Sequence, residues 1–314
     1  MGQSYFIECP KCDYSSSEIT MGVGFLFGNI DDLLHGLKGE DKKTVQFLHS
    51  RKTIHHHYSR GYSLYQCPEC HSLENKCHLD LYNSEGELQS TSDDHCTGPI
   101  RLLILSSTGK VFSAGHDLKE LKAARLNSDQ GKEYFQFILK KCSALMQTIV
   151  NHPKPVIAQV EGVATAAGCQ LALSCDLVYA SSTSRFATPG VNIGLFCSTP
   201  MVALSRNASS KQSMEMLLTG DLISADEAEQ KGLINKSVPE EDLENYLLEK
   251  AKKISSKSST TLKIGKKAFY RQIEMPLDKA YEYASQVMVE NMLDQDANEG
   301  MDAFLDKRKP SWKS

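Results

Sequence analysis

Hydrophobic periodicity divides the second part of the chain into short strands and longer helices. Arg101 to Ser106 and Pro155 to Glu161 are short apolar runs, which are typical of buried strands. Between them, apolar residues recur at helical spacing from Glu133 to Val150. Pro153 ends this helix because proline cannot continue it, so we interpret His152 as a helix-end residue.

The same alternation of strands and helices continues towards the C-terminus. Further strands are predicted at Asp176–Ala180 and Arg185–Pro189. Ser224 and Glu227 form a capping-box pattern that opens a helix ending near Gly232. Helices are then predicted at 240–255, 260–271 and 276–293. The pattern indicates an α/β fold with a helical C-terminal segment.

Two segments carry small residues at the point where a strand passes into a helix. They are KVFSAGHDLKEL, residues 110–121, and EGVATAAGCQLALSCD, residues 161–176. A helix start offers free backbone N–H groups, and short side chains let a ligand approach that backbone closely. Two such starts facing one point would supply two donors to a developing oxyanion.

These segments, with FATPGVNIGLFCSTP and EGMDAFLDKRKPSW further on, resemble the crotonase (enoyl-CoA hydratase/isomerase) superfamily. The resemblance covers roughly residues 99–312. It implies a ββα spiral, a C-terminal helical segment that covers the site and builds a trimer contact, and a coenzyme A thioester as substrate or ligand. It also implies a homotrimer or a hexamer.

The resemblance assigns site residues by motif position. The thioester carbonyl would accept hydrogen bonds from the backbone N–H groups of His116 and Ala167. Lys119 and Lys307 would contact coenzyme A, Lys307 across to a neighbouring subunit; the alternative is that both lysines are solvated surface charges. Asp117 is more simply interpreted as a helix-start residue.

The two catalytic glutamates of the hydratases are replaced in this chain. Gln170 and Gly190 stand at their motif positions, and neither side chain can take a proton. The His116 imidazole or a bound anion such as bicarbonate could substitute as the base. Cys197 is interpreted as a buried thiol, as are Cys142, Cys169 and Cys175.

The N-terminal block has a different character. Cys9 and Cys12, then Cys67 and Cys70, form two C-P-x-C pairs, the spacing of a four-cysteine structural zinc site. This resembles a zinc ribbon with a long insert; free thiols or a redox pair are the alternative. His55 to His57 are interpreted as a solvated turn rather than as a second metal site.

The change in character places a domain boundary at residues 96 and 97. We expect a zinc-ribbon-like domain at 1–96 and a crotonase-like domain at 97–314 that lacks the usual first hairpin and helix. The shift is consistent with a natural fusion or with two joined coding segments. A hairpin is predicted at Leu79 to Gln89, around Ser84-Glu85-Gly86.

Charge and composition exclude several classes of function. The net charge is −4, with −6 on residues 1–96 and +2 on the remainder, so nucleic-acid binding is not expected. No apolar run reaches the roughly 20 residues of a membrane span. The resemblance favours a mitochondrial protein, although neither a signal nor a transit peptide is recognisable at the start; otherwise a cytoplasmic location is expected.

Three functional hypotheses follow. The first is an acyl-CoA-directed member of the superfamily, acting on enoyl-CoA or related thioesters in fatty-acid metabolism. The second is a catalytically silent acyl-CoA binder or regulatory homologue, which the Gln170 and Gly190 substitutions support. The third is a zinc-ribbon interaction module on an inactive scaffold.

Overall fold

The computed structural model describes residues 101–107 and 110–314 in full. Before them it describes the backbone of five strands, which are β1 (Gln3–Tyr5), β2 (Ile19–Met21), β3 (His57–Gln66), β4 (Leu73–Tyr82) and β5 (Leu88–Ser92). The predicted zinc ligands Cys9, Cys12, Cys67 and Cys70 lie outside the described residues.

The main sheet has seven strands in the order β13-β10-β8-β6-β3-β4-β5. Its parallel half consists of β6 (Leu102–Leu105), β8 (Val156–Val160), β10 (Leu177–Ser181) and β13 (Lys236–Val238). Strands β6, β8 and β10 are apolar runs of the sequence, and parallel strands need such runs because both faces of the sheet are covered. Strand β13, with the sequence KSV, was not predicted. The strands expected at 101–106, 155–161 and 176–180 are therefore confirmed.

Antiparallel strands complete the other half of the main sheet. Ser63 of β3 pairs with Leu103 of β6, so the edge of the parallel half is covered by β3. Strand β4 pairs with β3 and with β5, which confirms the hairpin predicted around residues 84–86. A domain boundary at residues 96 and 97 stays a prediction, and the sheet itself continues across that position.

A second sheet of four short strands lies beside the first, in the order β12-β11-β9-β7. It contains β7 (Val111–Ser113), β9 (Val163–Thr165), β11 (Arg185–Ala187) and β12 (Ile223–Ser224). Both β7 and β9 are only three residues long and end directly before the two small-residue turns. The parallel pairing of β7 with β9 brings those two turns to the same edge.

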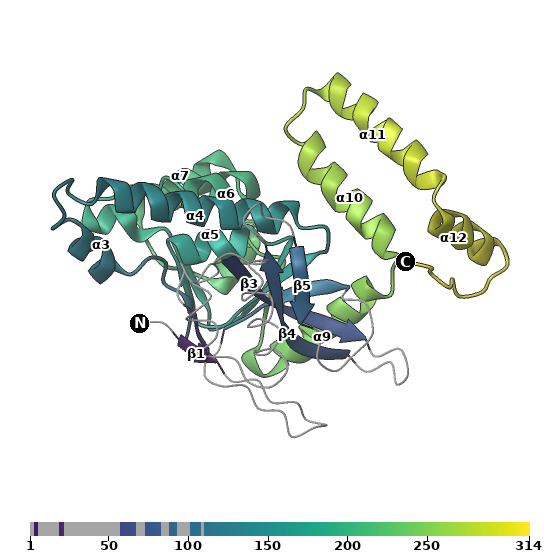
Figure 1. Ribbon diagram of the computed structural model, residues 1–314, viewed down its shortest axis with the longest axis horizontal. Coiled ribbons are helices and arrows are strands. Elements are labelled where there is room, and N and C mark those ends of the chain that lie inside the picture. The colour runs from purple at the N-terminus through teal and green to yellow at the C-terminus, as the bar shows by residue number, and fades with distance from the viewer. Residues whose placement is uncertain are drawn as a thin grey trace.

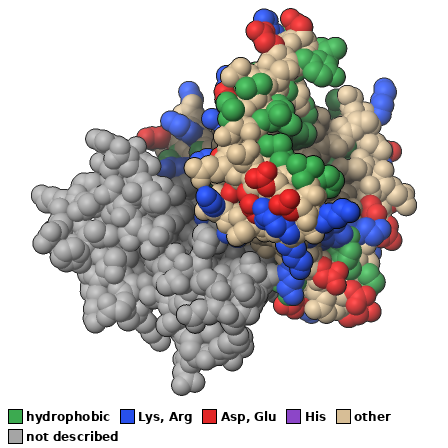
Figure 2. Space-filling model, turned by 90° about the vertical axis from the view of Figure 1, so that its right-hand side faces the viewer, with side chains coloured by type: hydrophobic (Ala, Val, Ile, Leu, Met, Phe, Trp, Pro, Cys, Tyr) green, Lys and Arg blue, Asp and Glu red, His purple; other side chains and the backbone are tan. Residues whose placement is uncertain are grey.

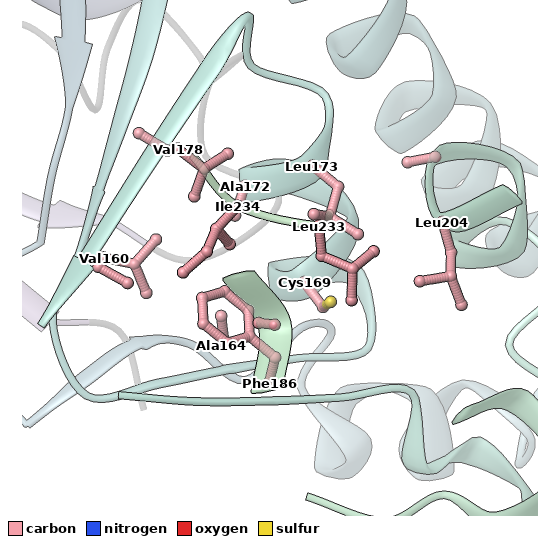
Figure 3. Close-up of a cluster of buried hydrophobic side chains, with 14 of the residues drawn as sticks. Val160, Ala164, Cys169, Ala172, Leu173, Val178, Phe186, Leu204, Leu233 and Ile234 are labelled. Carbon is pink, nitrogen blue, oxygen red and sulfur yellow. The ribbon is translucent and has the colours of Figure 1, made fainter. Parts of the chain in front are cut away.

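Side-chain alternation in the main sheet builds two cores. Leu102 and Ile104 face the helix α9 (Leu243–Ser255), which buries Leu243 and Leu247 against them. The opposite face packs on the helix α5 (Ala167–Leu173) and on the second sheet. Figure 3 shows this second core, where Phe186 lies among Val160, Ala164, Cys169, Val178 and Ile234. Phe186 has no exposed surface, so the core anchors both sheets to α5.

The remaining elements of the body follow the predicted pattern in part. The helix α4 (Lys132–Asn151) ends at His152, as expected. The helix α8 (Ala225–Gln230) opens with the Ser224 capping box. The helices α6 (Pro200–Asn207) and α7 (Ser210–Thr219) were not predicted. Short elements complete the body: α3 (Leu118–Ala124), η1 (Pro189–Ile193) and η2 (Glu240–Asp242).

Three C-terminal helices extend from the body as an arm, at the upper right of Figure 1. They are α10 (Ser259–Gln272), α11 (Leu277–Met292) and α12 (Gln295–Leu305). The last residues return to the base of the arm, where Trp312 Nε1 donates to the Ser256 carbonyl at 2.7 Å. The α/β fold with a helical C-terminal segment is thus confirmed. Within the described residues, none of the helices is long and apolar enough to cross a membrane.

Candidate functional site

The first small-residue turn links β7 to α3. Gly115 has φ +90°, a conformation that favours glycine, and it directs the chain from the strand into the helix. Asp117 caps α3, where its carboxylate accepts from the Lys119 N–H at 2.7 Å. This hydrogen bond lowers the pKa of Asp117. The interpretation of Asp117 as a helix-start residue is confirmed.

The second turn links β9 to α5 and holds a non-glycine residue in an unusual conformation. Ala166 has φ +51° and ψ −120°. Its N–H donates to the Ala187 carbonyl at 3.0 Å, and its carbonyl accepts from the Gln170 N–H at 3.0 Å. A non-glycine residue at positive φ costs roughly 1–3 kcal/mol, and such positions cluster at functional sites. The turn is therefore fixed from both sides, with the Ala167 N–H at the start of α5.

The two turns lie in direct contact. A Cβ placed on Gly115 would lie 3.0 Å from the Ala167 nitrogen. A Cβ on Gly168 would lie only 2.0 Å from the Ser113 carbonyl oxygen, so only glycine fits there. Thr165 Oγ1 also donates to the Ala114 carbonyl at 3.4 Å. The chain segments that carry His116 and Ala167 are thus held together, although 51 residues separate them in the sequence.

Both proposed oxyanion donors come from the turns themselves. Ala167 is the first residue of α5, where a backbone N–H has no acceptor within the helix. His116 follows Gly115 directly and precedes the α3 cap. Neither N–H donates to another backbone group among the described residues. The arrangement can supply two backbone donors to one oxygen atom.

The His116 side chain is half-buried beside this turn. Its Nε2 atom is enclosed and has no hydrogen-bond partner among the described residues. Burial lowers the pKa of His116, and the Glu120 carboxylate opposes this shift in part. The lowered pKa favours the neutral imidazole, which is the form that can accept a proton.

Gln170 lies in the first turn of α5 and is almost completely buried, with 4% of its surface exposed. Cys142 of α4 donates its thiol to Gln170 Oε1 across 4.0 Å. Cys142 also packs with Met146 and Ala167. The position predicted for the first catalytic glutamate thus holds an amide in contact with a thiol.

Gly190 lies in η1, and its surroundings are filled by the residues that follow. Its N–H donates to Cys197 Sγ at 3.3 Å. A Cβ at Gly190 would approach the Leu195 carbonyl oxygen to 2.7 Å and Cys197 Sγ to 2.9 Å. Cys197 is buried, as predicted, and burial raises the pKa of its thiol. The position predicted for the second catalytic glutamate therefore has no room for a side chain unless these neighbours move.

The two lysines predicted to contact coenzyme A are both exposed. Lys119 is the second residue of α3, whereas Lys307 follows α12 with φ +54°. Figure 1 places α3 and α12 at opposite ends of the molecule. One chain therefore does not bring the two lysines together.

The structure adds contacts that the sequence did not predict. Cys142 was expected only to face the core, as part of the apolar stripe of α4, and nothing in the sequence pairs it with Gln170. The positive φ of Ala166 likewise has no signal beyond the run of small residues. Cys142, Cys169, Cys175 and Cys197 are all buried free thiols, as predicted. The described residues hold no group of three or more His, Cys, Asp or Glu that could bind a metal ion.

Comparison with known proteins assigns the family. The enoyl-CoA hydratase/isomerase family profile matches residues 72–314. Enoyl-CoA hydratase domain-containing protein 3, mitochondrial, from Mus musculus is 53% identical over 213 residues, which cover 68% of this chain and 69% of that protein. Enoyl-CoA hydratase, mitochondrial, from Pongo abelii is 34% identical, over 72% of this chain and 74% of that protein.

Solved structures agree with the sequence relatives. The crystal structure of human enoyl coenzyme A hydratase domain-containing protein 3 superposes with a TM-score of 0.64 and 50% identity, covering 68% of this chain and 82% of that one. An enoyl-CoA hydratase from Mycobacterium smegmatis gives a TM-score of 0.65 and 45% identity over the same shares. The paired small-residue turns and the two sheets agree with these matches. The chain therefore belongs to the enoyl-CoA hydratase/isomerase family of the crotonase superfamily.

Proposed function

We propose that this protein binds an acyl-CoA thioester and polarises its carbonyl group with the backbone N–H groups of His116 and Ala167. The observation that carries the proposal is the contact between the turns, where Gly115 approaches the Ala167 nitrogen. The relatives are named as enoyl-CoA hydratases or hydratase-domain proteins, which supports a role in acyl-CoA metabolism.

Two donors at the thioester oxygen favour chemistry at the neighbouring carbon. They stabilise the negative charge that develops on the oxygen when a proton leaves C2, and one such donor typically contributes about 100- to 1,000-fold in rate. The His116 imidazole, which is half-buried beside the first turn and favoured in its neutral form by burial, is the base that we assign to this step. Return of a proton to C2 would exchange that proton with solvent. Delivery of the proton to C4 of a 3-enoyl chain would instead move the double bond.

Hydration is not the reaction that this site favours. A hydratase needs two carboxylates to activate and deliver water, whereas this chain has the buried Gln170 amide and the filled space at Gly190. The same observation supports the second candidate, a catalytically silent acyl-CoA binder. Lys119 supplies the first contact to coenzyme A in both cases.

One set of measurements separates these candidates. Calorimetry with butyryl-CoA tests binding, and loss of the C2 proton in deuterium oxide, followed by nuclear magnetic resonance, tests chemistry. Exchange that His116→Ala abolishes while binding persists supports the enzyme. Binding without exchange supports the silent binder, and absence of binding overturns the proposal. Turnover of crotonoyl-CoA to the 3-hydroxy product would show that hydration occurs despite the substitutions.

We further propose that the protein forms a homotrimer, in which Lys307 reaches the coenzyme A of a neighbouring subunit. The C-terminal helices support this because they expose Phe269, Ile273, Tyr281 and Leu293, at 55%, 56%, 70% and 82%. Figure 2 shows hydrophobic side chains gathered on the upper part of the face that it presents. Light scattering after size-exclusion chromatography would give three times the 34.9 kDa chain mass, and a monomer would overturn the proposal.

Location and metal content are separate proposals. The relatives named as mitochondrial support a mitochondrial location, which fluorescence microscopy of a tagged chain would test. The paired C-P-x-C spacing supports a structural zinc ion held by Cys9, Cys12, Cys67 and Cys70.

A further inference from the structure

A long run of the chain, from the last turns of α9 to the end of α10, is basic and contains no acidic residue. Residues 250–273 hold seven lysines and one arginine, and the acids that border the run are Glu249 and Glu274. Asp and Glu make up 39 of the 314 residues, so a run of this length would ordinarily hold about three. Lys266 neutralises Asp176 inside the protein. No other lysine of the run forms an ion pair with a described residue.

The joint between α9 and α10 gathers several of these lysines around Ser256. The Ser256 N–H donates to the Lys252 carbonyl at 3.1 Å, and the Ser256 hydroxyl donates to the Lys253 carbonyl at 2.8 Å. Lys257 follows directly in the sequence. From the C-terminal tail, Trp312 Nε1 donates to the Ser256 carbonyl at 2.7 Å. Two segments that lie 56 residues apart therefore meet at one serine.

The tail brings one more lysine to this joint and holds it there. The Lys313 N–H donates to the Asp296 carboxylate at 2.8 Å, and the Ser314 hydroxyl donates to the same carboxylate. The Thr260 N–H of α10 donates to the Ser314 hydroxyl at 3.3 Å. Figure 1 marks this end of the chain at the base of the arm, beside α10. We name the exposed lysines of the joint the joint patch: Lys252, Lys253, Lys257 and Lys313.

The acids beside the joint patch leave most of its positive charge uncompensated. Asp296 is buried, with 2% of its surface exposed, and the tail already occupies its carboxylate. The charge of Glu299 acts on Lys313, but this carboxylate is held by the Arg308 guanidinium at 2.6 and 2.9 Å. Like charges gathered on one surface repel one another, so an anionic partner would be attracted to this joint.

Aromatic side chains lie beside the joint patch. Trp312 is half-buried, and its ring lies 3.4 Å from a Cβ built on Gly300 of α12. Phe304, one helical turn after Gly300, is 83% exposed. Tryptophan and lysine together are typical of surfaces that meet the headgroup region of a bilayer. Binding of single-stranded nucleic acid would instead require aromatic rings on which successive bases stack, whereas the Trp312 ring packs on α12.

We propose that the joint patch is a docking surface for a bilayer of anionic phospholipid. Its four ammonium groups would lie on the lipid phosphates, and Trp312 would lie at the level of the headgroups. A lysine close to an anionic bilayer contributes about 5-fold to the affinity, and salt screens this attraction. The inference goes beyond acyl-CoA binding and does not depend on it, because none of the four lysines belongs to the two turns of the site.

Cosedimentation of the full chain with vesicles tests the inference. We expect the protein to pellet at low salt with vesicles of phosphatidylcholine and phosphatidylglycerol, and not with phosphatidylcholine alone. At about 1 M NaCl, where screening reaches down to about 3 Å, the binding should be lost. The double variant Lys253→Glu with Lys257→Glu should lower the affinity for the anionic vesicles by at least about 25-fold.

A second double variant provides the matched control. Lys140→Glu with Lys211→Glu makes the same change in net charge at exposed positions of α4 and α7. It should keep the affinity within about 3-fold, because charges away from the contact are screened.

The fluorescence of Trp312 reports directly on this surface, since the chain contains a single tryptophan. Brominated phosphatidylcholine in the anionic vesicles quenches a fluorophore that touches the bilayer. We expect quenching of Trp312 in the wild type and in the control variant. High salt and the Lys253→Glu with Lys257→Glu variant should abolish it.

Three results would overturn the inference: no pelleting with anionic vesicles at low salt, equal losses in the two double variants, or binding without quenching of Trp312. Binding of polyuridylate with the same charge dependence, without pelleting by vesicles, would assign the patch to nucleic acid and overturn it as well. Circular dichroism verifies the fold of each variant. If the glutamate variant does not fold, Lys253→Gln with Lys257→Gln replaces it, and its expected loss is about 25-fold.

Discussion

Lys266 of α10 places its ammonium group 2.7 Å from a carboxylate oxygen of Asp176, the residue before β10. The same nitrogen donates to the carbonyls of Ile149 and Lys154, at 2.9 and 3.1 Å. Asp176 also accepts from Tyr270 at 2.9 Å. These contacts join α10 to the end of α4 and to the main sheet, so they connect the C-terminal arm to the body.

Replacing Lys266 with methionine should destabilise the protein strongly. The side chains of Lys266 and Asp176 are only 7% and 15% exposed, so the variant leaves a buried carboxylate without its cation. Breaking such a pair typically costs about 3–5 kcal/mol in the free energy of unfolding. Urea denaturation followed by circular dichroism measures this loss.

The exposed pair of Lys279 and Glu282 provides the control. Its atoms also approach to 2.8 Å, but the side chains are 63% and 71% exposed. Lys279→Met should therefore change the free energy of unfolding by less than about 1 kcal/mol. Equal losses in the two variants would mean that the Lys266 pair does not hold the arm.

Gly168→Ala should separate the two turns of the site. The added Cβ would meet the Ser113 carbonyl at 2.0 Å, so the backbone of one turn must move. We expect a loss of about 1–3 kcal/mol in stability and weaker binding of butyryl-CoA, because the two N–H donors no longer converge. Chemical denaturation and calorimetry on the same preparation measure both effects.

Gly265 is the matched control for this substitution. It lies within α10, and no atom comes within 4 Å of a Cβ built there. Gly265→Ala should therefore stabilise the protein by roughly 0.5–1 kcal/mol, the usual gain in a helix interior. A Gly168→Ala variant with unchanged stability and binding would contradict the contact between the turns.

Local signals in the sequence predicted much of the fold. The apolar runs before Ser106 and Glu161 identified strands, and the Ser224 capping box identified the start of α8. The helix α7 was missed although Ser209 and Gln212 form the same kind of capping box. A strand end was expected within residues 110–121, where β7 lies, but its bounds were not predicted because three residues are too few to establish a period of two.

The candidate site was predictable only in its local part. The small-residue turns follow from the sequence, since glycine and alanine mark close backbone approach. The contact of Cys142 with Gln170 joins residues 28 apart, and the pair of Lys266 with Asp176 joins residues 90 apart. Such contacts depend on how helices pack, and no local pattern determines them.

Gly190→Glu should not restore hydration. The new side chain would displace the Leu195 carbonyl and Cys197 Sγ, which lie 2.7 and 2.9 Å from its Cβ. We expect a lower melting temperature and no hydration of crotonoyl-CoA, even when Gln170→Glu supplies the first carboxylate. Gln170→Glu alone is the control for folding. Rapid hydration by the double variant would show that the Leu195–Cys197 segment moves aside readily.

Cys9→Ser should remove zinc if the four N-terminal cysteines bind it. Loss of one thiolate from a tetrahedral site lowers its affinity strongly, so the variant should retain much less than one zinc ion per chain after dialysis. Cys142→Ser, a buried cysteine of the body, should keep the wild-type content. Mass spectrometry of the metal content decides this, and full retention of zinc in Cys9→Ser would contradict the assignment.

The stability of the protein should fall below pH 6.5 in a way that depends on His116. Burial lowers the pKa of His116 below its ordinary value of 6.5, so the unfolded chain binds a proton before the folded protein does. The stability that the neutral imidazole contributes is fully present above pH 6.5. It is lost as the pH falls through the pKa of the folded protein, and it does not change further below that pKa. His116→Asn removes this contribution. Protonation of the carboxylates changes the stability of the wild type and of the variant equally. Urea denaturation at pH 7.5 and 5.5 should therefore show a larger decrease for the wild type than for the variant. Equal decreases would mean that His116 is as accessible to protons in the folded protein as in the unfolded chain.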